Sequence, residues 1–330
     1  MSTRAWMPTT ALVLLAFIST SCQESEVPPP SVAASDSYTV VTTCGMVTDI
    51  VSNVVGEHGE VHGLMGEGVD PHMYKPTRND QAAILEADIV FYSGLLLEGR
   101  MADTFTRVSR QGKPIHAIAD HLDKSLLREP PEFSGHPDPH VWMDISMWSQ
   151  CVAFIEKSLS AFDPEHAESY RANAKAYRAR MSEMDGYVKE TIATIPENRR
   201  WLVTAHDAFG YFSRAYGIPV KSIQGITTDS TPAIKDVNDL VAFLVTNKID
   251  AVFVESSVNQ KNMRSIIEGC QEKNWTVKIG GKLYSDAMGT PGTYSGTYLG
   301  MMDHNATTIA RALGGTAPDT GKDGKLPAAK

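Results

Sequence analysis

Apolar runs alternate with amphipathic stretches through the first half of the chain. The run YTVVTTC at 38–44 is typical of a buried strand, and the next segment, 46–57, carries apolar residues at helical spacing. Thr77 followed by Asp80 is typical of the beginning of a helix, and a further helix is predicted at 145–162. Strands that alternate with helices in this way predict a parallel, doubly wound sheet.

A long helical pattern follows. Asp163 is a good N-cap residue and Pro164 suits the first helical position. Apolar side chains then recur at spacings of three and four as far as Pro196. They predict one helix over 163–195, roughly 45 Å long at 1.5 Å per residue. Because such a helix is stiffer than the loop crossovers of a hinged receptor, we expect no large closure motion.

The second half of the chain repeats the alternation of strands and helices. We therefore predict an α/β fold of two doubly wound lobes, with parallel sheets, joined by the one long linking helix. The N-terminal lobe is expected at 38–162 and the C-terminal lobe at 196–316. A chain of 330 residues exceeds what one core usually organises, which also favours two lobes. The polar tail at 317–330 is expected to be disordered.

The N-terminus has the pattern of an export signal. A positive charge precedes an apolar stretch at 7–18 that is too short to span a membrane. The pattern resembles a bacterial lipoprotein signal, with a signal peptide at 1–21 and a lipid-anchor tether at 22–37. Cys22 would then be acylated, and this anchor alone would hold the protein at the membrane, facing the periplasm or the exterior. Ser19 stands where such signals usually have leucine, so a soluble periplasmic protein is the alternative.

Composition narrows the possible partners and cysteine chemistry. The net charge is −9 and no basic run occurs beyond the first residues, so we expect no nucleic-acid partner. Apart from Cys22, the cysteines are Cys44, Cys151 and Cys270, widely spaced and without a CxxC pair. Buried free thiols are favoured over one disulfide with a leftover thiol, and no zinc-thiolate site is predicted.

The tripeptide Asp-Pro-His occurs twice, in VDPHMY at 69–74 and in PDPHVWMD at 137–144. Proline fixes its own φ and makes the preceding aspartate extended, so each tripeptide holds its histidine on a stiff loop. Histidine is the commonest metal ligand among side chains. His72 and His140 are therefore candidate ligands of a shared metal, although two histidines make an incomplete set.

Two further residues complete the candidate set. His206 and Asp286 each follow a predicted strand, where ligands bind in doubly wound sheets. Each lobe thus supplies two residues that could meet in the cleft between lobes. Three imidazoles and one carboxylate would close a nitrogen and oxygen shell around one divalent metal. Any one of these histidines alone would more commonly be a surface or core residue.

Four acidic residues have two open interpretations each. Asp207 follows His206 and either supports that ligand or caps a helix. Glu255, at a predicted strand end, either orients a ligand or has a capping or loop role. Asp70 and Asp138 fix turns, and either could also orient a ligand loop.

Across 38–314 the sequence resembles the metal-binding lipoprotein receptors of ABC importers, the cluster that takes up zinc, manganese or iron, and most of all its TroA branch. The motifs that carry the resemblance are VVTTCGMVTDIV, GVDPHMYKPT, DPHVWMD, LVTAHDAFGYFSRAYG, VFVESSVNQKN and YSDAMG. The resemblance implies His72, His140, His206 and Asp286 as the four ligands. It also implies two lobes joined by the long helix.

This resemblance implies a binding protein that is not an enzyme. A monomer would capture one divalent metal ion as cargo and deliver it to a cognate ABC permease. The permease's separate ATPase would drive import, since this chain contains no GxxxxGK[ST] loop. The histidine-rich loop of many zinc-specific members is absent, which weakens a zinc-only assignment. His206 stands where many manganese-specific members have glutamate, which favours zinc, with manganese as the alternative.

Two functions of other classes compete with this interpretation. A secreted zinc-dependent hydrolase needs an open coordination position for water, whereas four protein ligands fill the shell and HExxH is missing. A surface adhesin lipoprotein fits the predicted anchor, but it leaves the four-ligand set without a role.

Overall fold

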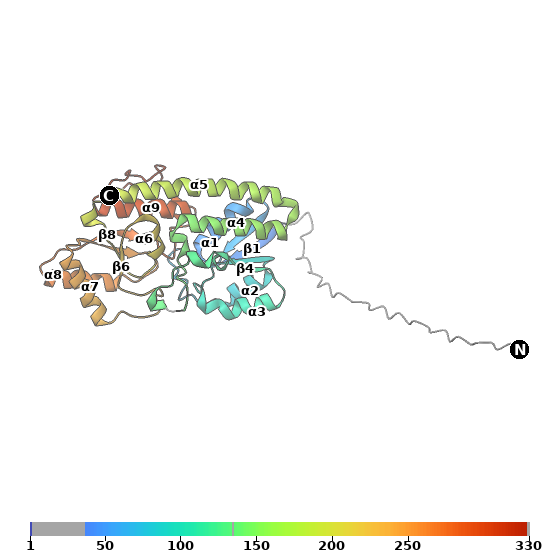
Figure 1. The fold of residues 1–330 in the computed structure, drawn as a ribbon, viewed down its shortest axis with the longest axis horizontal. Coiled ribbons are helices and arrows are strands. Elements are labelled where there is room, and N and C mark those ends of the chain that lie inside the picture. The colour runs from blue at the N-terminus through green and yellow to red at the C-terminus, as the bar shows by residue number, and fades with distance from the viewer. Residues whose placement is uncertain (2–36, 134, 329–330) are drawn as a thin grey trace.

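A computed structural model describes Met1 and residues 37–133 and 135–328 (Figure 1). The predicted signal peptide at 1–21, Cys22 and nearly all of the predicted tether at 22–37 lie outside the described residues. None of the helices in the described ranges is both long enough and apolar enough for a bilayer crossing.

The N-terminal lobe contains one parallel sheet of four strands in the order β2-β1-β3-β4. Its strands are β1 (Tyr38–Thr42), β2 (Gly59–Gly63), β3 (Ile89–Tyr92) and β4 (Ile115–Ala117), and its helices are α1 (Gly45–Val55), α2 (Arg78–Glu86), α3 (Ala102–Arg110) and α4 (Ile145–Phe162). The apolar residues of α1 at helical spacing are buried, as expected of a helix that covers a sheet. The predicted helix start at Thr77 is confirmed, and there Thr77 and Asp80 form a reciprocal capping box.

The long helix α5 (Ala167–Ala193) is confirmed. It contacts α4 of the N-terminal lobe and α9 (Tyr298–Ala312) of the C-terminal lobe, so it lies along both lobes (Figure 1). Its start differs from the prediction, because a 3-10 turn at Pro164–His166 precedes it. The carboxylate of Asp163 therefore makes no N-cap bond. It accepts hydrogen bonds from His166 Nδ1 at 2.7 Å and from the Tyr170 hydroxyl at 2.5 Å.

The C-terminal lobe is also parallel, but its strands form two ladders, β5-β6 and β7-β8. The strands are β5 (Leu202–Thr204), β6 (Val220–Ser222), β7 (Ala251–Glu255) and β8 (Lys278–Leu283), and the helices are α6 (Gly210–Tyr216), α7 (Ile234–Thr246), α8 (Lys261–Glu272) and the closing α9. Since β5 contacts β7, the four strands follow the same spatial order as in the first lobe. The predicted class of two parallel α/β lobes is confirmed.

The tail differs from the predicted disorder. The buried carboxylate of Asp303, on α9, accepts the Lys322 N–H at 3.0 Å, and Leu326 is only 7% exposed. Gly321 has φ +74°, and a Cβ there would lie 2.5 Å from Asp303 Oδ2. The described part of the tail, residues up to 328, is held by these contacts with α9, which its polar composition does not reveal.

All three cysteines of the described ranges, Cys44, Cys151 and Cys270, are buried free thiols. This confirms the favoured interpretation, with neither a disulfide nor a thiolate site among the described residues. Burial raises the pKa of the Cys44 thiol to about 12, so this thiol is protonated at neutral pH. None of these three cysteines belongs to the group of residues in the described ranges that could hold a metal ion.

Candidate metal centre

The four predicted ligands come together from four separate loops. His72 lies between β2 and α2, and His140 lies just before α4. His206 lies two residues after the end of β5, and Asp286 lies three residues after the end of β8. One ligand atom from each of these residues lies within 4.8 Å of the other three, and no other such group of His, Cys, Asp or Glu occurs in the described ranges.

The group is compact and closed to solvent. His206 Nε2 lies 3.1 Å from Asp286 Oδ2, and His140 Nε2 lies 3.4 Å from Asp286 Oδ1. His72 Nε2 lies 3.2 Å from His140 Nε2 and 3.9 Å from Asp286 Oδ2. Relative exposure is 0% for His140 and His206, 1% for Asp286 and 7% for His72. The three imidazoles therefore face one carboxylate in a buried space.

Two atoms of this group have no hydrogen-bond partner among the described residues. They are His206 Nε2 and Asp286 Oδ1, both buried. Although His206 Nε2 is close to Asp286 Oδ2, the pair does not have hydrogen-bond geometry. An unsatisfied buried polar atom costs about 1–3 kcal/mol, so such atoms are uncommon unless a ligand completes them. A metal ion between the four residues would satisfy both.

The Asp-Pro-His repeat has a common local structure with one important difference. In each copy, aspartate Oδ1 accepts the backbone N–H of the histidine, at 2.9 Å for Asp70 and 3.0 Å for Asp138. Asp138 Oδ1 also lies 2.8 Å from Nδ1 of His140, whereas no such contact joins Asp70 to the ring of His72. Asp138 thus both fixes its turn and orients its histidine, whereas Asp70 fixes its turn without contacting the ring of His72.

Both carboxylate oxygens of Glu255 contact His206 or its neighbouring backbone. Its Oε2 is 2.5 Å from His206 Nδ1, and its Oε1 accepts the backbone N–H groups of Ala205 at 2.7 Å and of His206 at 2.9 Å. This contact keeps Nε2 of His206 pointing at Asp286. Asp207 is half-buried, its N–H donates to the Gly225 carbonyl at 3.1 Å, and it is not one of the four grouped residues.

The charges of the group are unequal. Burial, only partly offset by the charge of Asp286, lowers the pKa of His72 to about 3. For His140, burial opposes protonation, but the contacts with Asp138 and Asp286 raise the pKa to about 9. Burial likewise opposes protonation of His206, yet the charges of Asp286 and Glu255 hold its pKa well above the usual range. The Asp286 carboxyl is buried, but the nearby imidazoles hold its pKa well below the usual range.

Several supporting residues were missed by the sequence interpretation. Arg128 contacts the carboxylate of Asp138, and the Trp142 indole donates to the Ser285 carbonyl at 3.0 Å. Ser257 Oγ lies 3.5 Å from Asp286 Oδ2. No local sequence pattern marks these residues. The Trp142–Ser285 contact, for example, joins residues of the two lobes that are far apart in the chain.

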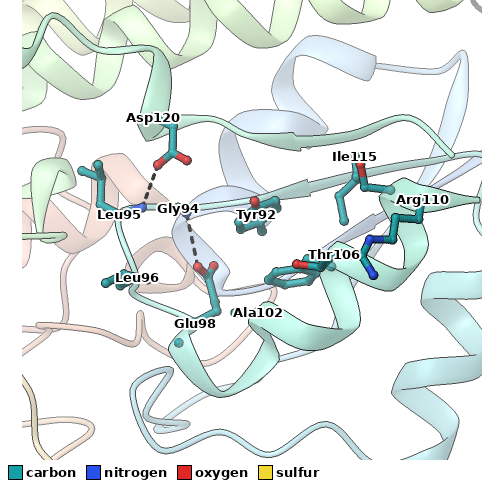
Figure 2. A pocket seen from close by; sticks show the side chains of 13 residues that line it. Tyr92, Gly94, Leu95, Leu96, Glu98, Ala102, Thr106, Arg110, Ile115 and Asp120 are labelled. Atoms are coloured by element: carbon teal, nitrogen blue, oxygen red, sulfur yellow. Dashed lines mark hydrogen bonds between the residues drawn. The ribbon is translucent and has the colours of Figure 1, made fainter. Parts of the chain in front are cut away.

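A separate cavity of about 390 Å³ lies on the N-terminal lobe beside α3 and β3 (Figure 2). Glu98 and Asp120 accept the backbone N–H groups of Gly94 and Leu95 at its edge. None of the four grouped residues lines it. The candidate metal centre is therefore a closed group of side chains and is distinct from this open cavity.

The chain is similar to known metal-binding proteins. The family model described as "Zinc-uptake complex component A periplasmic" matches residues 40–312. The manganese-binding lipoprotein MntA of Bacillus subtilis is 45% identical over 281 residues, which cover 85% of this chain and 91% of MntA. The zinc-binding protein TroA of Treponema pallidum is 42% identical over 285 residues, covering 85% and 90% of the two chains.

Solved structures are similar over nearly their whole lengths. The structure of Treponema pallidum TroA superposes with a TM-score of 0.82 at 40% identity, covering 84% of this chain and 99% of that one. The Fe(III)-bound YtgA of Chlamydia trachomatis superposes with a TM-score of 0.76 at 27% identity, covering 85% and 99%. The names of these similar proteins mention three different metals.

Proposed function

Because this chain belongs to the family of zinc-uptake component A, the extracytoplasmic metal-binding proteins of ABC importers, we propose that its four grouped residues bind one divalent metal as cargo. The ligands are His72, His140, His206 and Asp286. Proteins of this family bind substrates for transport and are not enzymes. The observation that carries the proposal is the convergence of three imidazoles on one buried carboxylate.

The favoured cargo is Zn²⁺. Zinc takes nitrogen ligands in a four-coordinate shell and binds more tightly than manganese in the Irving–Williams order. Manganese is the second candidate, because the two oxygens of Asp286 face different histidines at 3.4 and 3.1 Å and together raise the possible coordination number. MntA, which is described as manganese-binding, is among the similar proteins.

An equilibrium competition between Zn²⁺ and Mn²⁺ for the metal-free protein beginning after Cys22 tests this proposal. One tight equivalent with a strong zinc preference supports zinc as the cargo. Comparable or stronger manganese binding would mean that Asp286 and the rigidity of the cleft override the preference of imidazole for zinc, and would overturn the zinc assignment. Absence of tight binding by both ions would overturn the site itself.

Delivery requires a cognate ABC permease with its ATPase. In the proposed arrangement the protein is a monomer, with lobes at 38–162 and 196–316 linked by 163–195. It is held at the membrane by an acylated Cys22, or is soluble in the periplasm if Cys22 is not acylated. A closed four-ligand shell retains its metal, so the permease must distort the shell to release the ion.

Metal binding is expected to release protons. At pH 7 the raised pKa values keep His140 and His206 protonated, whereas His72 is neutral. Because a ligating imidazole must be neutral, binding at pH 7 should release about one to two protons. Affinity should rise with pH towards the His140 pKa of about 9 and fall as the pH is lowered. Titration calorimetry in buffers of different ionisation heat measures this release, and equal heats in all buffers would contradict it.

Glu255→Gln is expected to weaken metal binding by about 10–100-fold. A glutamine amide cannot serve all three donors that the carboxylate now satisfies, namely His206 Nδ1–H and the N–H groups of Ala205 and His206. If its NH₂ faces the ring, Nδ1 becomes the acceptor and Nε2 carries the proton, which prevents ligation. Competition with a chelator of known affinity measures the loss. Glu268→Gln, on helix α8, is the control and should bind metal normally.

A further inference from the structure

The two histidine loops of the N-terminal lobe are held against the C-terminal lobe in different ways. The His140 loop is fixed by buried contacts. The Tyr211 hydroxyl donates to the Asp138 carbonyl at 2.9 Å, and the Trp142 indole donates to the Ser285 carbonyl at 3.0 Å. The second of these contacts also fixes Ser285, which precedes Asp286, and Glu255 holds His206. Three of the four proposed ligands, His140, His206 and Asp286, therefore lie on rigid, buried structure.

His72 lacks comparable support. Its Nδ1 has no hydrogen-bond partner among the described residues, whereas Nδ1 of both His140 and His206 contacts a carboxylate. It is also the most exposed of the proposed ligands, at 7% against 1% or less. The ring of His72 is therefore positioned by the backbone of its own loop.

That loop is joined to the C-terminal lobe by two threonine hydroxyls. Thr228 donates to Asp70 Oδ2, and Thr290 donates to Glu67 Oε2 at 2.7 Å. We call these two hydrogen bonds the threonine contacts. Between them the loop runs close to the C-terminal lobe, since a Cβ at Gly68 would lie 3.6 Å from the Ser256 carbonyl oxygen. Both Glu67 and Thr290 are exposed to solvent.

We infer that metal enters and leaves by opening of the 66–72 loop, and that Thr228 and Thr290 are positioning residues that set the rate of this exchange. The inference rests on the proposed metal centre. Opening here breaks two partly exposed hydrogen bonds and withdraws one ligand. Any path through the His140 side breaks the buried Tyr211 and Trp142 contacts instead. Because α5 contacts both lobes, a local opening also needs no rotation of one lobe against the other.

The threonine contacts exist in the closed loop whether or not metal is bound. Removing them should therefore favour opening of both forms, so that association and dissociation accelerate together and the equilibrium affinity is nearly preserved. Removal of a ligand behaves differently, because it accelerates dissociation and weakens affinity in proportion. The comparison of rates with affinity thus separates positioning from ligation.

The experiment measures Zn²⁺ association, and Zn²⁺ dissociation into excess chelator, by stopped flow. The proteins are the parent chain, Thr228→Val, Thr290→Val and the double variant. From the net strength of a hydrogen bond, each substitution should raise both rates about 5-fold and the pair about 25-fold, with Kd changed by less than about 3-fold. Thr227→Val is the matched control, because Thr227 donates to Asp229 at 2.5 Å within its own loop, and its rates should equal those of the parent.

The variants Thr228→Ser and Thr290→Ser keep the hydroxyl and should exchange metal as slowly as the parent. Unchanged rates in the double variant, with metal still bound, would overturn this inference and leave the metal centre intact. A rise in Kd equal to the rise in dissociation rate would also overturn it, since the hydroxyls would then be holding ligand geometry. Failure of the parent protein to bind both Zn²⁺ and Mn²⁺ would refute the proposed function itself. Thermal unfolding of each metal-free variant verifies its folding.

Discussion

Replacing Asp286 with alanine is expected to weaken metal binding by more than about 100-fold, beyond the effect of losing a residue that only orients a ligand. Asp286 supplies the single negative charge of the proposed ligand set, and its two oxygens lie 3.1 Å from His206 Nε2 and 3.4 Å from His140 Nε2. Without it, three buried imidazoles would face a divalent cation with no negative charge in the ligand set. Equilibrium competition with a chelator measures the loss for Zn²⁺ and Mn²⁺ separately.

Asp250→Ala is the matched control for this experiment. Asp250 lies on the same lobe and pairs with Arg199 at 2.9 Å, but its side chain is 43% exposed and does not contact the metal centre. This variant should bind metal as the parent does, because an exposed ion pair contributes little. If Asp286→Ala bound metal with the parent's affinity, Asp286 would have to be removed from the proposed ligands.

Trp142→Ala is expected to cost about 3–5 kcal/mol in the free energy of unfolding of the metal-free protein. The indole is fully buried, and its ring centroid lies 5.3 Å from that of His140 and 6.2 Å from that of Trp148. Its removal leaves a cavity and frees the Ser285 carbonyl, which now accepts the indole N–H. Urea unfolding followed by circular dichroism measures the change.

Trp142→Phe separates packing from the hydrogen bond. It retains most of the buried ring but leaves the Ser285 carbonyl without its donor, so the expected loss is about 1–3 kcal/mol. Since Ser285 precedes Asp286, both variants should also weaken metal binding. A loss below about 1 kcal/mol for Trp142→Ala would show that the two lobes do not depend on this contact.

Local patterns predicted the elements because each pattern is complete within a few residues. Apolar spacing and helix-terminal signals placed α4 and α5, and the Thr77–Asp80 pair marked the start of α2, where it forms a capping box. Asp163 was a partial failure, because the 3-10 turn after it moved the start of α5. The tail at 317–330 also differed, since its order depends on Asp303, a residue outside the segment.

The ligand-bearing loops could be predicted for a related reason. Parallel strands place the loops at their carboxyl ends on one edge, so residues such as His206 and Asp286 are candidates from chain order alone. The repeat of Asp-Pro-His added His72 and His140. Whether the four side chains would meet within 4.8 Å depended on how the lobes pack.

The sequence by itself determined the class of fold, the long helix and the four candidate residues, because periodicity, capping and strand-end position are local properties. Only the tertiary structure decided which acidic residues orient the ligands. Glu255 and Asp138 contact imidazole rings, whereas Asp70 reaches across to Thr228. The contacts of Glu255 and Asp70 join residues that are distant in the chain. Asp138 contacts the ring of its near neighbour His140, but Asp70 in the same tripeptide makes no such contact with His72, so the tripeptide alone does not determine it. Each contact depends on side-chain distances of a few ångströms that follow from packing.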